Sequence, residues 1–175
     1  MNNAGCIDET TTAKVPYGPA AWRAAQGSIP DPTAGRARLQ HHDKRSTILV
    51  VDDTPENIAT LAAVLNGEYR TKAATDGEKA LELARSDPGV DLILLDVVMP
   101  GMDGVQTLAA LRRLPALAEV PVAFLTGSNR AVDGDRYLEL GAIGAIGKPL
   151  NPRTLASAVL TVWEQRPYWQ ACQTR

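Results

Sequence analysis

The sequence predicts a doubly wound α/β fold, in which a five-stranded parallel sheet is flanked by five helices. The first observation is that short apolar runs, typical of strands buried on both faces, alternate with helical segments. The second is that the connections are short. Right-handed crossovers then make the strands parallel and place helices on both faces of the sheet. Ligands of such sheets bind at the carboxyl ends of the strands.

The first half of the pattern begins at residue 47. "TILVVDD" is a continuous apolar run that ends in acid, which predicts a buried strand. Thr54 then provides a helix N-cap and Pro55 the first helical position, and apolar residues at helical spacing continue to Leu65. "YRTKAA" predicts a short second strand and "DGEKALELARS" a helix. "DLILLD" predicts a third strand that is buried on both faces.

The second half repeats the alternation. "VQTLAALRRL" predicts a helix and "VPVAFLT" the fourth strand. "NRAVDGDRYLEL" predicts a weaker helix, because it contains Gly134. "AIGAI" predicts the fifth strand. Asn151 and Pro152 cap and start a final helix whose inward face is apolar.

Composition divides the chain and limits its partners. Residues 1–46 have no sustained apolar period and predict a flexible extension, residues 47–165 form the domain, and residues 166–175 a short tail. The formal charge of the 175 residues is -2, which gives no reason to expect a nucleic-acid or membrane surface. No apolar run is long enough to span a bilayer and the N-terminus lacks an export signal, so we expect a cytoplasmic protein.

Charged and polar residues gather at the predicted strand ends. The first strand ends in Asp52 and Asp53, the third in Asp96 and the fourth in Thr126, and the fifth runs into Lys148. Packing does not explain three acids at one edge, because they repel one another and lose solvation. Mg²⁺ would relieve this repulsion. With a phosphoryl group present, an aspartate can act as nucleophile, while metal, lysine and hydroxyl neutralise the transferring oxygens.

The lysine lies in "GAIGAIGKPL", which has some likeness to a phosphate-binding loop of nucleotide enzymes. That loop needs a glycine where this chain has Ala142, and a hydroxyl residue where it has Pro149. A proline directly after Lys148 also disfavours the helix that should begin there. We therefore expect no nucleotide site, and interpret the lysine as part of the strand-end cluster.

The motifs "ILVVDD", "LILLDVVMPGMDG", "FLTG" and "GKP" resemble the receiver domain of two-component response regulators, over residues 47 to about 165. The resemblance implies a flavodoxin-like sheet of strand order 2-1-3-4-5. It implies that Asp96 accepts a phosphoryl group from a histidine kinase or histidine phosphotransfer protein, giving a 4-aspartylphosphate that signals to an unknown protein target. "EQRPYWQACQTR" is too short for an effector domain, so we expect a stand-alone, CheY-like receiver. The stretch "DTPENIATLAAVL" is most similar to receivers often joined to cyclic-dinucleotide enzymes.

The resemblance also assigns a role to each matching residue. Lys148 would pair with the acceptor and then with a phosphoryl oxygen, and Thr126 would turn its hydroxyl toward another phosphoryl oxygen. A cis peptide bond is common in the family before the residue equivalent to Pro149. Asp103 is interpreted as a turn or cap residue and not as a ligand. The implied Mg²⁺ ligands are Asp52, Asp53, Asp96 and the backbone carbonyl of Val98.

One departure from the family pattern concerns signal output. Ala145 stands where the family usually has Tyr or Phe, whose inward rotation reports phosphorylation. We therefore expect the usual relay from Thr126 to an aromatic ring to be missing. Any surface change should be small, or should run through the loop of residues 127–134.

Two alternatives to a phosphoacceptor remain open. A phosphate-independent interaction module with this fold is favoured by Ala145 alone, and the retained acids oppose it. An aspartate-nucleophile phosphatase of the haloacid dehalogenase kind uses similar residues, but there the acid pair comes last, whereas Asp52 and Asp53 come first here. The leading interpretation is not an enzyme, because a receiver catalyses only its own phosphorylation and dephosphorylation.

Overall fold

Five parallel strands form one sheet in the order β2-β1-β3-β4-β5 in the computed structural model, which describes residues 46–127 and 136–173. The predicted fold class and strand order are confirmed. After β2 the chain crosses to the other side of β1, so the loops that follow β1 and β3 diverge at the carboxyl edge of the sheet. The strands are β1 (Thr47–Val51), β2 (Arg70–Ala74), β3 (Leu92–Asp96), β4 (Val122–Thr126) and β5 (Gly144–Gly147).

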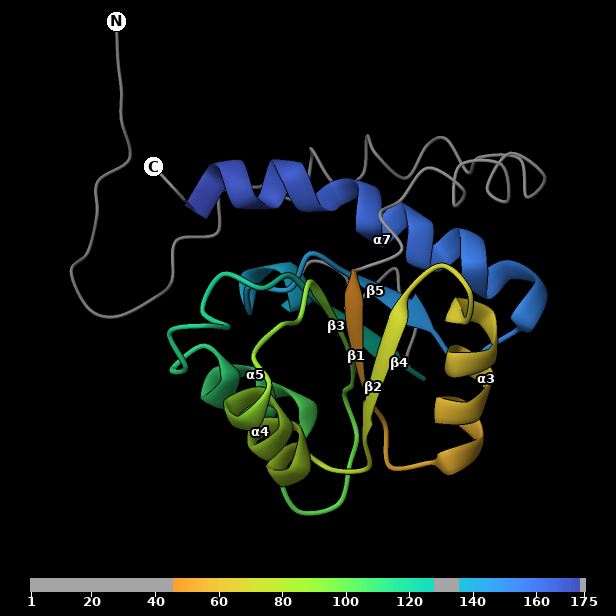
Figure 1. Cartoon of the computed structure of the whole chain (residues 1–175), viewed down its shortest axis with the longest axis horizontal. Coiled ribbons are helices and arrows are strands. Elements are labelled where there is room, and N and C mark those ends of the chain that lie inside the picture. Colours follow the sequence, from red (N-terminus) through yellow and green to blue (C-terminus); the bar gives the residue numbers. More distant parts are fainter. Residues whose placement is uncertain (1–45, 128–135, 174–175) are drawn as a thin grey trace, which may run out of the picture.

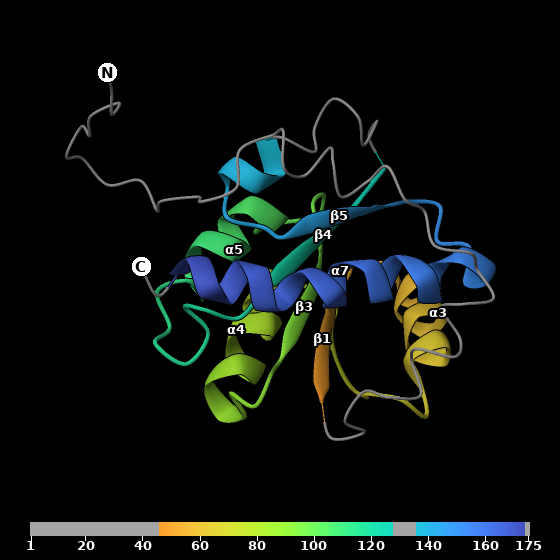
Figure 2. The ribbon, with the colours of Figure 1, turned by 90° about the horizontal axis from the view of Figure 1, so that it is seen from above.

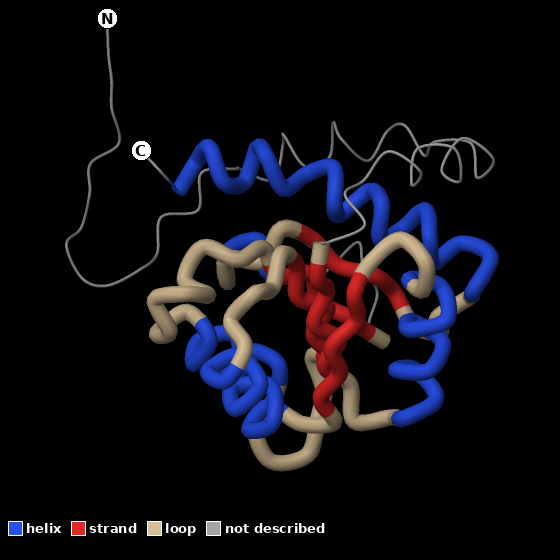
Figure 3. Tube along the Cα trace, viewed as in Figure 1, coloured by secondary structure: helices blue, strands red, loops and turns tan. Residues whose placement is uncertain are grey.

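Helices cover both faces of this sheet (Figures 1 and 2). α4 and α5 contact each other on one face, and α3 and α7 contact each other on the opposite face. Residues 136–139 are also helical. Figure 3 shows the strands in red between the two helical layers in blue. The helices with full bounds are α3 (Pro55–Leu65), α4 (Gly77–Ser86), α5 (Gly104–Leu111) and α7 (Pro152–Gln173).

The core consists of two apolar clusters, one on each side of the sheet. Side chains of a strand alternate between its faces. On β1, Leu49 and Val51 therefore join the cluster beneath α4 and α5, whereas Ile48 and Val50 join the cluster beneath α3 and α7. All residues of β1, β3 and β4 are buried. The expectation that the first and third strands are buried on both faces is thus confirmed.

A side-chain cap marks the start of α5 but not that of α3. The side chain of Asp103 accepts the backbone N–H of Gln106 at 2.7 Å and the Gln106 side chain accepts the N–H of Asp103, which is a complete capping box. Asp103 is thus a cap residue, as predicted. Thr54 is at the N-cap position of α3, but its hydroxyl donates to Asp53 at 3.2 Å and does not cap the helix.

Several element boundaries differ from the sequence prediction. α5 ends at Leu111, whereas the apolar period predicted a helix to residue 114, because the chain turns where the Arg112 side chain binds the following carbonyls. α7 continues to Gln173, past residue 165. The predicted extension, apart from residue 46, and residues 128–135 of the loop and weaker helix lie outside the described residues. Among the residues that the structure describes, none of the helices is both long and apolar enough to cross a bilayer.

Candidate functional site

Strand register brings the predicted site residues to one edge of the sheet. Val51 at the end of β1 pairs with Leu95, so Asp52 follows beside Asp96. On the other side, Thr126 at the end of β4 pairs with Gly147. The backbone N–H of Lys148, the next residue, donates to the carbonyl of Thr126 at 2.7 Å. Neighbouring parallel strands thus hold the acids, the hydroxyl and the ammonium together.

Three carboxylates form a compact acidic cluster at this edge. Asp52, Asp53 and Asp96 each have one carboxylate oxygen within 4.8 Å of the others. Asp52 is fully buried and Asp96 is only 3% exposed, whereas Asp53 is exposed to solvent. Burial without compensation is costly for such groups, so the cluster requires positive charge nearby.

Asp52 is held in place by the start of α3. Its Oδ1 accepts hydrogen bonds from the backbone N–H of Thr54 and from Nδ2 of Asn57, both at 3.0 Å. Its buried Oδ2 has no hydrogen bond of good geometry within the described residues, although Nζ of Lys148 lies 2.8 Å away as an ion pair. The positive charge of the Lys148 ammonium stabilises this oxygen across the short distance. A hard divalent cation fits such a set of carboxylate oxygens.

Lys148 bridges the two buried acids. Its Nζ lies 2.6 Å from Oδ2 of Asp96 and 2.8 Å from Oδ2 of Asp52. Burial alone lowers the pKa of Lys148, but its close contacts with the two acids and their negative charges outweigh burial, so the pKa is raised. Burial raises the pKa of Asp96 and the charge of Asp52 adds to this, against the opposing hydrogen bond from Lys148. The ammonium is thus fixed beside the predicted acceptor.

The loop after β3 wraps closely around Asp96. The backbone N–H of Val98 donates to Oδ1 of Asp96 at 3.2 Å. Gly104 donates its N–H to the carbonyl of Val97 at 2.9 Å. A Cβ atom at position 104 would overlap the carbonyl oxygen of Asp96, so only glycine permits this approach. The tight loop keeps the second carboxylate oxygen of Asp96 oriented by the backbone.

An aromatic residue does lie beside Thr126, contrary to the sequence prediction. The Thr126 hydroxyl forms a buried hydrogen bond of 3.1 Å with the hydroxyl of Tyr137. Tyr137 comes from the helical residues 136–139, not from β5, which explains why inspection of position 145 missed it. Its apolar spacing in "DRYLEL" indicated burial but not this partner. The prediction that the peptide bond before Pro149 is cis is confirmed.

Asn57 is the second site residue that the sequence reasoning missed. It stands one turn into α3, and its amide reaches Asp52 from the helix that follows the acid pair. Asn57 is the last residue of "VDDTPEN", so its closeness to the acid pair was visible in the sequence, but only the helix start fixes the direction of its side chain. The predicted side chains all lie at this edge of the sheet. The backbone carbonyl of Val98 as a metal ligand stays a prediction.

Fold and site together define a doubly wound α/β protein with an acidic, lysine-bearing site at the carboxyl edge of its sheet. Residues 48–160 match the family profile of the response regulator receiver domain. The chain belongs to this family. Phosphorylation and Mg²⁺ binding are typical of its members, which histidine kinases phosphorylate and which act on downstream targets.

Similar proteins support the assignment. A probable cyclic di-GMP phosphodiesterase of Vibrio cholerae is 43% identical over 115 residues, which are 66% of this chain and 26% of that protein. The transcriptional regulatory protein CpxR of Escherichia coli is 39% identical over 127 residues, covering 72% of this chain and 52% of that one. The chain therefore spans about a quarter and about half of these relatives.

Two solved structures support the fold. The chemotaxis protein CheY4 of Vibrio cholerae matches with a TM-score of 0.62 and 29% identity, over 67% of this chain and 98% of that one. A putative response regulator from Chloroflexus aurantiacus matches with a TM-score of 0.61 and 30% identity, over 69% and 99%. The sheet and its flanking helices are thus those of a CheY-type receiver.

Proposed function

We propose that this chain takes a phosphoryl group from a phosphohistidine donor onto Asp96, and signals through protein–protein contacts. The observation that carries the proposal is the ion pair of 2.6 Å between Nζ of Lys148 and Oδ2 of Asp96, inside an acidic cluster in which Asp52 and Asp96 are buried. An ammonium in this position neutralises charge that a phosphoryl group would bring. A purely structural ion pair would not need two further carboxylates beside it.

In the proposed phosphoryl transfer, Asp96, Lys148 and Thr126 each have a distinct role. A carboxylate oxygen of Asp96 attacks phosphorus, the bond from phosphorus to the donor imidazole nitrogen breaks, and that nitrogen keeps the electron pair. Lys148 then pairs with a phosphoryl oxygen in place of the free carboxylate. The Thr126 hydroxyl donates to a second phosphoryl oxygen. The product is an acyl phosphate, which water can hydrolyse.

Mg²⁺ is the cofactor we propose for the site. Asp52, Asp53, Asp96 and the backbone carbonyl of Val98 would hold it, and it would supply positive charge to the phosphoryl oxygens. The donor set supports this proposal, because all its members are oxygens and the buried Oδ2 of Asp52 lacks a directed hydrogen bond within the described residues. Exposed Asp53 gives the site an accessible ligand.

A labelling experiment tests the proposed acceptor. With Mg²⁺ present, a small phosphodonor such as acetyl phosphate should label the protein, and intact mass should increase by one phosphoryl group. Asp96→Asn should abolish the label, because an amide oxygen is a poor nucleophile and gives no acyl phosphate. Asp103→Asn is the matched control. It removes an acid close by, but Asn also caps helices well, so labelling should persist.

The same experiment separates the alternatives. Persistent labelling of Asp96→Asn would refute the acceptor assignment. Steady hydrolysis of a phosphate monoester by the wild-type protein would instead favour the phosphatase. Equal binding of a downstream protein to labelled and unlabelled chain would favour the phosphate-independent module. We propose a histidine kinase or a histidine phosphotransfer protein as donor, since receivers are phosphorylated by histidine kinases.

A further inference from the structure

The aromatic ring beside Thr126 comes from the helical residues 136–139 and not from β5. Ala145 on β5 pairs with Phe124 on β4 and packs against the apolar cluster beneath α4 and α5. Tyr137 belongs to the same cluster, and its ring centroid lies 4.9 Å from that of Phe124. The small residue on β5 is therefore accompanied by a large ring from residues 136–139.

The phenol of this ring is engaged with the hydroxyl that the proposed transfer requires. Tyr137 is only 5% exposed and Thr126 only 2%, and their hydroxyl oxygens are 3.1 Å apart. Either hydroxyl can be the donor of this bond. In the proposed transfer Thr126 donates its single proton to a phosphoryl oxygen on Asp96, and a side chain that turns to do so takes its oxygen away from the phenol whichever group donates. The two partners therefore compete for Thr126.

We propose that Tyr137 is the positioning residue coupled to phosphorylation in this chain: its phenol holds Thr126 in the unphosphorylated state and is released when Thr126 turns to the phosphoryl group. This inference rests on the proposed function and adds the route by which the signal leaves the site. The ring acts through Thr126 and does not touch the reacting atoms.

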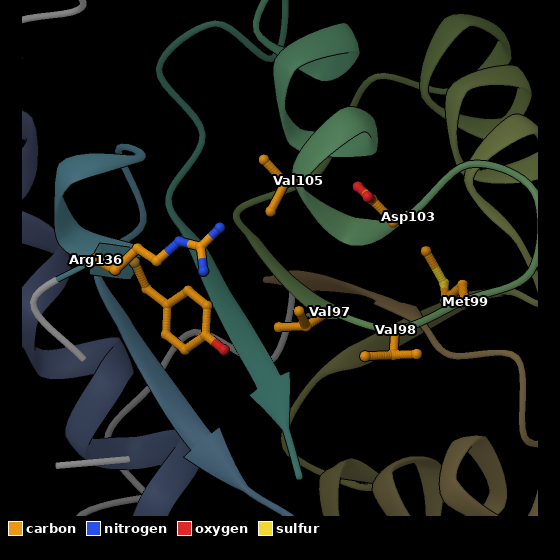
Figure 4. Close-up of a pocket in the computed structure, with 7 residues that line it drawn as sticks. Val97, Val98, Met99, Asp103, Val105 and Arg136 are labelled. Atoms are coloured by element: carbon orange, nitrogen blue, oxygen red, sulfur yellow. The ribbon is translucent and has the colours of Figure 1, made fainter. Parts of the chain in front are cut away.

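Release of the phenol would alter a neighbouring cavity of about 290 Å³. Arg136 and Tyr137 line one side of it, and Val97, Val98 and Met99 from the loop after Asp96 line the other. Figure 4 shows Arg136 across the cavity from the labelled residues of that loop. The change should therefore reach the surface between residues 136–139 and this loop, and not the last strand.

The test uses beryllofluoride as a phosphoryl analogue, titrated with Mg²⁺ onto the full chain. Tyr137→Phe keeps the ring and removes the hydroxyl, so the analogue no longer competes with the phenol. Its apparent Kd should tighten roughly three- to tenfold, as expected for the loss of one competing hydrogen bond. Tyr69→Phe removes a buried phenol on the opposite side of the sheet and should leave the Kd unchanged.

A second readout is made on the wild-type protein. With tyrosine labelled by ¹³C at the ring carbon bearing the hydroxyl, the Tyr137 signal of the wild-type protein should shift when the analogue binds. The Tyr69 signal should not shift. In Thr126→Val, which cannot form the bond, the Tyr137 signal should stay in one position with and without analogue.

The outcomes distinguish this inference from the proposed function. If wild-type protein takes up no analogue, the proposed function fails and the inference falls with it. If wild-type protein takes it up and Tyr137→Phe binds with equal or weaker affinity, only the coupling through Tyr137 is overturned. A Tyr137 signal that does not move on binding would overturn the coupling as well. Tighter binding together with a shifted signal supports it.

Discussion

The ammonium of Lys148 lies 2.6 Å from a carboxylate oxygen of Asp96, although 52 positions separate the two residues in the chain. The same nitrogen is 2.8 Å from Asp52, so one positive charge serves two buried acids. Removing one partner of a buried ion pair leaves uncompensated charge, which costs more than the pair itself contributes. The stability of the fold at the proposed phosphoacceptor site therefore depends on the single ammonium of Lys148.

Lys148→Met should lower the stability of the protein. Without Mg²⁺, we expect the free energy of unfolding to fall by about 3 kcal/mol, because Asp52 and Asp96 then repel each other with no cation between them. Saturating Mg²⁺ should restore more stability to the variant than to the wild-type protein. Urea unfolding with and without Mg²⁺ measures both quantities.

Lys79→Met provides the control for that experiment. Lys79 is also paired with an acid, Asp76, at 2.8 Å, but its side chain is 61% exposed. Solvent-exposed pairs contribute little, so the change should stay within about 1 kcal/mol and should not depend on Mg²⁺. If Mg²⁺ stabilised Lys148→Met no more than wild type, Lys148 and Mg²⁺ would not be compensating the same carboxylate charges.

Gly104→Ala and Gly127→Ala make a matched pair on either side of the acceptor. A methyl group at position 104 would overlap the backbone of Asp96, whereas at position 127 it would meet no described atom within 4 Å. We expect Gly104→Ala to lower the free energy of unfolding by more than about 2 kcal/mol, and Gly127→Ala to change it by less than about 0.5 kcal/mol. Thermal unfolding of both variants checks this, and equal losses would contradict the close approach.

The convergence of Asp52, Asp96 and Lys148 could be predicted because each residue ends a strand or directly follows one. In a parallel sheet, strand ends share one edge whatever the loops do. The apolar runs fixed which segments are strands, since β1 and β3 are buried along their whole length. The order of apolar runs along the chain is therefore enough to predict that these three residues are neighbours in the fold.

The bond between Thr126 and Tyr137 could not be predicted in the same way. It depends on how a helical segment, residues 136–139, packs on the sheet, and helical spacing gives the buried face but not the contact. The end of α5 at Leu111 has a similar origin. Its apolar period continues, but the side chain of Arg112 satisfies carbonyls of the next turn. Polar contacts of individual side chains, which apolar spacing does not reveal, decide both cases.

Arg112 should be a strong stabiliser of that turn. Its guanidinium donates to the carbonyls of Leu117 at 3.1 Å, Val120 at 2.6 Å and Gly141 at 3.1 Å. These bonds connect the end of α5 to the loop that precedes β5. Arg112→Met keeps an apolar stem but removes all three bonds, so we expect a loss of about 2–3 kcal/mol. Arg113→Met, at an exposed neighbouring position, should change stability by less than about 0.5 kcal/mol in the same urea titration. Similar effects of the two variants would contradict this role.

Tyr69 should make the protein lose stability in alkaline solution. Burial raises its pKa from 10.0 to about 12; the charge of Glu68 adds to the rise and that of Arg166 opposes it. The folded protein thus holds the phenol proton more tightly than the unfolded chain. The resulting stability is fully present below pH 10 and is lost as the pH rises toward 12, by about 2 kcal/mol at most.

Other groups also titrate between pH 10 and 12, so the measurement is the difference in unfolding free energy between wild type and Tyr69→Phe. That difference should be constant from pH 7 to 9 and then shift in favour of the variant. A difference that stays constant throughout would show that the phenol proton is not held by burial.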